Sequence, residues 1–162
     1  MEANTLKGIA VVSLHEGATL GRVEQPLFDL AARQLRGLEV RGDNGTFIVP
    51  FEQIESIGND AVTVASSQVT QTASASSSTG TMMGTNELKK LKVVDNTGTF
   101  LGTLEAIEFD TTDGRVTSLS AHKGGLLGVG GTTTPLDASS ILVVGSDLLT
   151  VDTNIDTTPS ET

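Results

Sequence analysis

Hydrophobic positions along the chain fall in short runs that are rich in Val, Ile, Leu and Thr. Turn signals separate these runs at close spacing, among them "DNTG" at residues 95–98 and "TDGR" at residues 112–115. An Asp-Gly pair suits a tight hairpin. Short β-branched runs between turns indicate a small all-β unit rather than a βαβ repeat.

Prolines modify this pattern at a few positions. Pro26 lies inside a strand-like run, which predicts an edge strand or a bulge. Only "PFEQIES", starting at Pro50, and "PLDASS", starting at Pro135, are expected to form a helical turn.

The pattern occurs twice, as an internal repeat. The segment "LKGIAVVSLHEGATLGRVEQPLFD" from Leu6 aligns with "LKKLKVVDNTGTFLGTLEAIEFD" from Leu88. Further on, "TFIVPFEQIESIGNDAVTV", ending at Val64, aligns with "TTTPLDASSILVVGSDLLTV", ending at Val151, each with a proline, a Gly-x-Asp turn and a final strand. About six short strands in each half predict two small β-barrels, because closure removes exposed sheet edges.

A Ser/Thr-rich segment separates the two halves. Residues 67–85 carry no charge and too little apolar surface to offset the entropy of ordering, so we expect a flexible linker. Its reach as a coil is roughly 25 Å. The predicted organisation is a first repeat at 4–66, a second at 86–152, and a disordered tail at 153–162.

Charge and composition narrow the function classes. Ten basic and twenty acidic residues give a net charge of −10, which repels phosphate backbones, so direct nucleic-acid binding is not expected. The absence of cysteine excludes disulfides, thiolate metal sites and cysteine nucleophiles.

The chain start, "MEANTLKGIAVVSLHEG", lacks the basic region and long apolar core of a secretory signal. Elsewhere the longest uninterrupted aliphatic run is "ILVV" at 141–144, far short of the roughly 18 residues of a membrane helix. We therefore expect a cytoplasmic protein without a transmembrane segment.

A series of motif residues resembles the PRC-barrel family, named for the cytoplasmic domain of the photosynthetic reaction-centre H subunit. The shared features are a "G-x-x-L-G" strand, a longer strand ending in Phe-Asp, a proline, and a Gly-x-Asp turn. In this chain the motif residues are Gly21, Phe28, Asp29, Pro50 and Gly58, and again Gly102, Phe109, Asp110, Pro135 and Gly145.

The resemblance implies a partly open barrel of about six strands that binds other macromolecules and has no known catalytic site or cofactor. Family members include the reaction-centre subunit and a ribosome small-subunit maturation factor. The expected function is a non-catalytic protein-binding or scaffold module in the assembly or regulation of a complex, and the alternative is a ribosome- or RNA-associated assembly factor. Expected partners are other proteins, together with pairing of the repeats in one chain or as a homodimer.

The glycine-rich stretch "GGLLGVGG" at 124–131 admits two uses. A phosphate loop is not expected, because the glycines run in the reverse order of G-x-G-x-x-G and "TTTP" follows them rather than a helix. The stretch is then a hairpin whose glycines adopt backbone angles denied to other residues, or a partner-contact tip. The tip would comprise Gly124, Gly125, Leu126, Leu127, Gly128 and Val129.

Other polar residues give weaker candidates. His15 and His122 occupy non-equivalent positions without a second metal ligand nearby, so ordinary surface roles are expected. Asp29 and Asp110 could approach each other across a pseudo-twofold axis, but each follows a Phe at a turn, where it is expected to bind backbone amides.

Two further motifs have structural interpretations as well. "DNTG" at 95–98 lacks the further acids and distal Glu of a calcium loop. Lys89, Lys90 and Lys92 are interpreted as charges protecting an exposed strand, with a site for an acidic partner as the alternative.

Overall fold

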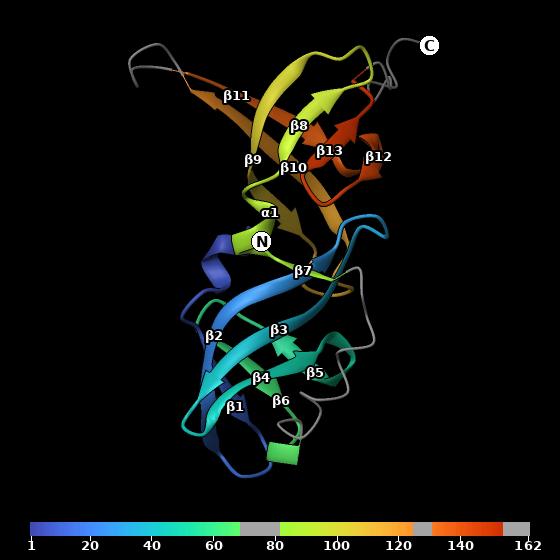
Figure 1. Ribbon diagram of the computed structural model, residues 1–162. Helices are drawn as coiled ribbons and strands as arrows, with labels where there is room; N and C mark the ends of the chain where they lie inside the picture. Colours follow the sequence, from blue (N-terminus) through green and yellow to red (C-terminus); the bar gives the residue numbers. More distant parts are fainter. Residues whose placement is uncertain (69–81, 125–130, 154–162) are drawn as a thin grey trace.

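Strands dominate the structure, a computed structural model that describes residues 1–68, 82–124 and 131–153 (Figure 1). The first repeat contains β1 (Ala10–Ser13), β2 (Ala18–Asp29), β3 (Gln34–Gly42), β4 (Gly45–Pro50), β5 (Ile54–Ile57) and β6 (Ala61–Val64). The second contains β8 (Lys92–Asp95), β9 (Phe100–Phe109), β10 (Val116–Gly124), β11 (Gly131–Asp137), β12 (Ile141–Val144) and β13 (Leu148–Val151). The predicted all-β architecture of two small barrels with about six strands each is confirmed.

The two sheets have the same topology. Their strand orders are β4-β3-β2-β1-β6-β5 and β11-β10-β9-β8-β13-β12. Sequential neighbours pair antiparallel, whereas the first strand of each repeat pairs parallel with the last but one in the order, β1 with β6 and β8 with β13. Within each sheet this leaves the fourth and fifth strands of the repeat at the two ends of the hydrogen-bonded path.

Pro26 lies in an interior strand. β2 tolerates it because the register with β3 shifts on both sides, between Val23 and Gln25 and between Leu27 and Phe28. Of the two predicted explanations, the bulge is correct.

The described residues include the short helical turns η1, η2, α1 and η5. η2 (Phe51–Gln53) and η5 (Ala138–Ser140) lie in the two segments predicted to form them. η1 (Ala3–Leu6) and α1 (Thr85–Leu88) were not predicted, because a single turn is too short to show a helical hydrophobic period. Across the described ranges no helix is both long and apolar enough to cross a membrane.

The segment before each repeat crosses to the other repeat. β7 (Met83–Gly84) pairs with β2 beside Phe28, and Met1 exchanges both of its main-chain bonds with Phe109. These segments lie outside the predicted boundaries of 4–66 and 86–152, and the predicted linker is wrong at its C-terminal end. These crossings could not be predicted from the hydrophobic pattern of the sequence, because main-chain pairing needs only amides and carbonyls.

The two repeats share one hydrophobic core. Phe28, the last residue but one of β2, and Phe109, the last residue of β9, meet edge to face with ring centroids 5.9 Å apart. Around them the buried aliphatic residues of both halves form a single cluster. The stacking of the repeats along one axis (Figure 1) therefore buries apolar surface that a barrel of about 60 residues would otherwise expose.

Two reciprocal hydrogen bonds mark the pseudo-twofold relation. The amide of Leu35 donates to the carbonyl of Gly114 at 2.7 Å, and that of Val116 donates to the carbonyl of Arg33 at 2.9 Å. Gly114 has φ +74°, and Arg33 at the equivalent position has φ +56°, the one positive φ outside glycine among the described residues. The Arg33 guanidinium reaches into the second repeat, donating to the carbonyls of Ala138 at 2.7 Å and Ile141 at 3.2 Å.

Candidate functional site

The motif glycines bring neighbouring strands together. A Cβ on Gly21 would lie closer than 3.0 Å to the carbonyl oxygen of Arg41 on β3. A Cβ on Gly102 would meet the carbonyl oxygen of His122 on β10 equally closely. Their role in the described structure is close packing of the strand backbones.

The remaining motif residues form turns. Gly58 and Gly145 each donate an amide across the turn before the last strand, to Ala61 at 2.9 Å and Leu148 at 2.8 Å. The two prolines are not equivalent. Pro50 precedes η2 and pairs with Gly37, whereas the residue that precedes η5 is Asp137, two positions after Pro135. The proline alignment was wrong because a strand can be offset by two residues without changing which face its side chains occupy.

Asp29 and Asp110 each serve their own turn. Asp29 accepts the amide of Ala32 at 3.1 Å, and Asp110 accepts that of Thr112 at 2.7 Å. The amide of Thr112 lowers the pKa of Asp110 below its ordinary value. These contacts agree with the prediction that each Asp binds backbone amides of its own turn.

Turn hydrogen bonds also act on two other carboxylates. Asp95 of "DNTG" accepts from the hydroxyl of Thr97 at 2.6 Å and from the amide of Thr99 at 2.9 Å, and these bonds lower its pKa. The pKa of Asp137 is lowered by the amide and hydroxyl of Ser139. Within the described residues no three His, Cys, Asp or Glu side chains are grouped so that they could hold a metal ion.

The structural setting of Lys89, Lys90 and Lys92 differs from the one predicted. Lys89 and Lys90 directly follow α1, and Lys92 opens β8. β8 is paired on both sides, by β9 and β13, so the prediction that these lysines protect an exposed strand edge is wrong. The sequence could not show which strand would have two neighbours.

The histidines occupy separate places. His15 follows β1 and donates its amide to the carbonyl of Ala65, and His122 lies on β10 with its Nδ1 3.0 Å from the hydroxyl of Thr133. Gly124 pairs with Gly131 at the end of the β10–β11 hairpin. The other predicted contacts of the tip, residues 125–129, lie outside the described residues.

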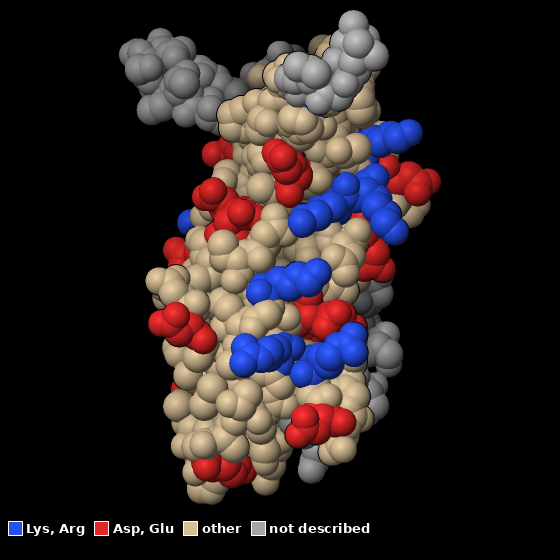
Figure 2. All heavy atoms as spheres, turned by 90° about the vertical axis from the view of Figure 1, so that its left-hand side faces the viewer, with Lys and Arg blue, Asp and Glu red and all other residues tan. Residues whose placement is uncertain are grey.

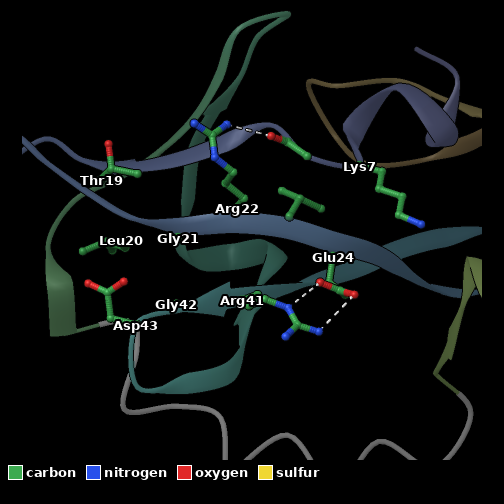
Figure 3. A pocket seen from close by; sticks show the side chains of 11 residues that line it. Lys7, Thr19, Leu20, Gly21, Arg22, Glu24, Arg41, Gly42 and Asp43 are labelled. Atoms are coloured by element: carbon green, nitrogen blue, oxygen red, sulfur yellow. Dashed lines mark hydrogen bonds and ion pairs between the residues drawn. The ribbon is translucent and has the colours of Figure 1, made fainter.

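Basic side chains gather over one face of both repeats, with acidic side chains between them (Figure 2). On the first repeat this face contains a hollow of about 650 Å³, here called the basic groove, which Lys7, Arg22 and Arg41 line together with Glu24 and Asp43 (Figure 3). Arg22 donates to the carbonyl of Gly8 at 3.0 Å, and Arg41 donates to the Glu24 carboxylate at 3.1 Å. The carboxylates offset much of the positive charge.

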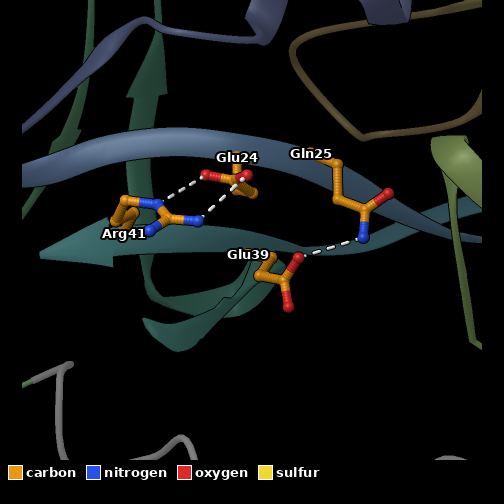
Figure 4. Close-up of polar contacts among 4 residues, drawn as sticks. All are labelled: Glu24, Gln25, Glu39 and Arg41. Carbon is orange, nitrogen blue, oxygen red and sulfur yellow. Dashed lines mark hydrogen bonds and ion pairs between the residues drawn. The ribbon is translucent and has the colours of Figure 1, made fainter. Parts of the chain in front are cut away.

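Beside the basic groove, a polar network joins the repeats. Gln25 donates to Glu39 across β2 and β3 at 3.0 Å (Figure 4), and its carbonyl oxygen accepts the amide of Asn86 in α1 at 3.0 Å. Gly84 packs directly beneath this side chain, where a Cβ would clash with it. Gln25 is thus a bridge between the repeats.

A second hollow of about 410 Å³ lies between the repeats, and we call it the junction groove. The first repeat contributes the β2–β3 turn, and the second contributes the turn after β12. The lining residues are Asp29, Leu30, Ala31, Met83, Val144, Gly145 and Ser146. Neither repeat forms this groove alone.

Exposed aliphatic residues continue from the junction groove along the second sheet. Leu142 is 50% exposed, Val143 61% and Leu148 42%, and we call these three the apolar edge. They lie on β12, the last strand of its sheet, and on its neighbour β13. Exposed clusters of large aliphatic residues commonly mark interaction sites.

The apolar edge was not predicted, although the sequence contains a signal for it. The bulge registers make Leu142 equivalent to Glu55 and Val143 equivalent to Ser56. A position-by-position comparison of "ILVV" with "IESI" would have shown that only the second repeat is apolar at these sites.

Comparison with known proteins agrees with the fold. The family model of the PRC-barrel domain matches the chain twice, at residues 1–71 and 80–157. A search of curated proteins gives no match to this chain. The matched segments include Met1 and Met83, whose main chains cross to the other repeat. The duplicated six-stranded topology and these two matches show that the chain belongs to the PRC-barrel domain family, as two tandem copies.

Proposed function

We propose that this chain is a non-catalytic protein-binding module that acts in the cytoplasm in the assembly or regulation of a protein complex. The observation that carries the proposal is the apolar edge of Leu142, Val143 and Leu148. It continues into a groove that both repeats build, so the duplication itself creates the surface.

The energy available at the apolar edge supports a protein partner. Covering three aliphatic side chains that are already about half buried contributes roughly 3 kcal/mol. Nucleic acid offers little aliphatic surface in return, and the net charge of −10 opposes its approach. A protein surface supplies both apolar side chains and hydrogen-bonding main chain.

The alternative, a ribosome- or RNA-associated assembly factor, has one supporting feature. Lys7, Arg22 and Arg41 line the basic groove, where phosphates could approach. Glu24 and Asp43 in the same groove weaken that attraction, and we rank this function second.

The test is capture of partners from lysate with the full chain, with and without nuclease, using the wild type and Leu142→Glu/Val143→Ser. This variant copies the first repeat at exposed positions, so it is expected to fold, which circular dichroism checks. The matched control is Glu55→Gln/Ser56→Thr on β5. We expect a protein partner that survives nuclease, binds the control, and is lost from the variant.

Two results would contradict the proposal. Loss of every partner on nuclease treatment would favour the RNA-associated alternative. Equal capture by the wild type and Leu142→Glu/Val143→Ser would show that the apolar edge is not the contact.

A further inference from the structure

Among the described residues β12 pairs with a strand on one side only, and at its start the carbonyl of Ile141 accepts the Arg33 guanidinium at 3.2 Å. Its inner side pairs with β13, and its outer side pairs with no strand among residues 1–68, 82–124 and 131–153. The free amides and carbonyls of a terminal strand can pair with another chain in an extended conformation. β12 also lies at the margin of the upper repeat in Figure 1.

The first repeat shows how the same edge looks when it is protected. Both terminal strands carry a bulge at the same place, between Ile54 and Ser56 in β5 and between Ile141 and Val143 in β12. In β5 the bulged position is Glu55, and the Ser56 hydroxyl lies 2.6 Å from that of Thr63. Charge and satisfied hydroxyls discourage strand addition, whereas the aliphatic residues of β12 favour it.

The junction groove supplies a place for an anchoring side chain. Val144 ends β12, and it lines the groove with Gly145, Ala31 and Met83. A segment that follows the outer side of β12 therefore reaches a hollow of about 410 Å³ that is bounded by both repeats. Apolar hollows with a few polar neighbours are typical of side-chain recognition.

The size of this surface decides between occupants. Stable interfaces between folded proteins use about 20–30 residues a side. Three exposed aliphatic side chains and one groove are far fewer, and this argues against a second folded copy as the occupant. An extended segment obtains its affinity from main-chain hydrogen bonds and a few side-chain pockets, which is what this surface offers.

We propose that β12 accepts an extended aliphatic segment of another protein as an added strand of the second sheet, with one of its side chains in the junction groove. This inference rests on the proposed protein-binding function and specifies its partner: a strand-forming segment in which branched aliphatic residues alternate with polar ones. Leu142 and Val143 contact that segment, and Val144 and Met83 receive the anchoring side chain.

The test uses the full chain and a panel of fluorescein-labelled peptides of about six residues, in which Val, Ile or Leu alternates with Thr or Lys. We expect saturable binding by anisotropy with a Kd of about 100 µM or tighter. Leu142→Glu/Val143→Ser weakens it at least about tenfold, and Glu55→Gln/Ser56→Thr leaves it unchanged. Proline at alternate peptide positions abolishes binding, because it removes the amide donors. Exchange of the amide protons of residues 142–144 slows when the peptide binds.

Several results would overturn the inference. One is the absence of binding by any peptide of the panel, and another is equal binding by Leu142→Glu/Val143→Ser. Dimerisation of the wild type in sedimentation that this variant abolishes would make a second copy the occupant. At least tenfold tighter peptide binding by a chain that ends at Thr153 would make residues 154–162 the occupant.

The capture and peptide-binding experiments together distinguish this inference from the proposed function. A nuclease-resistant partner that depends on Leu142 and Val143, without any peptide binding, overturns strand addition and leaves protein binding supported. Partners that are all lost with nuclease contradict the proposed function whatever the peptides do.

Discussion

At Arg33 we predict that substitution by alanine destabilises the protein more than substitution by glycine, the reverse of the usual order. The Arg33 backbone has φ +56°, where a side chain costs about 1 kcal/mol, and the equivalent residue in the second repeat is glycine. Its guanidinium donates to two carbonyls of the other repeat, at 2.7 and 3.2 Å. A hydrogen bond from a charged group contributes about 1.5 kcal/mol at the lower end of its range, which suits this half-buried side chain.

Arg33→Ala loses both bonds and keeps the backbone strain, so we expect the free energy of unfolding to fall by about 3 kcal/mol. Arg33→Gly loses the same bonds but relieves the strain, so its loss is about 2 kcal/mol. In an ordinary strand or helix glycine is the more destabilising of the two. Arg36→Ala is the control, because its ion pair with Asp29, at 3.8 Å, is partly exposed and contributes less than about 0.5 kcal/mol.

The chain has no Trp or Tyr, so the assay is urea unfolding followed by far-ultraviolet circular dichroism rather than by intrinsic fluorescence. Because the repeats share one core, the wild type is expected to unfold in a single transition. If Arg33→Ala were as stable as Arg33→Gly or more so, the strain argument would fail. Losses below about 0.5 kcal/mol in both variants would show that the guanidinium does not hold the repeats together.

Two further predictions concern the strands and the turns. Gly21→Ala places a methyl group against the carbonyl of the next strand, and we expect the free energy of unfolding to fall by more than about 2 kcal/mol. Gly124 has open space around it, so Gly124→Ala is the control and is expected to be close to neutral. Chemical unfolding measures both variants, and equal losses would refute the packing role of Gly21. Because turn hydrogen bonds lower the pKa of Asp95 and Asp137, their stabilisation is present above the ordinary value of 3.8 and is lost as the pH falls through the lowered values. Asp95→Asn should therefore lower the thermal midpoint at neutral pH and reduce its decline below about pH 4, and an unchanged acid decline would contradict this.

The all-β fold and its duplication could be predicted from the sequence because the hydrophobic pattern is local. Alternating short runs and turn residues specify strands wherever they occur, and their repetition indicated two copies. The same reasoning misassigned the setting of Lys92 and the alignment of Pro135. Strand neighbours and registers depend on contacts between distant residues, which periodicity along the chain does not encode.

The sequence by itself determined two β units and the places of their turns, because residue preferences act over a few positions. Only the tertiary structure decided that the units share one core across Phe28 and Phe109, and that Arg33 spans their junction. It also decided which strands are terminal, and hence that Leu142 is exposed on an edge whereas Lys92 opens an interior strand. The physical reason is that burial and pairing are set by what packs from elsewhere in the chain, so equal sequence patterns can end on different surfaces.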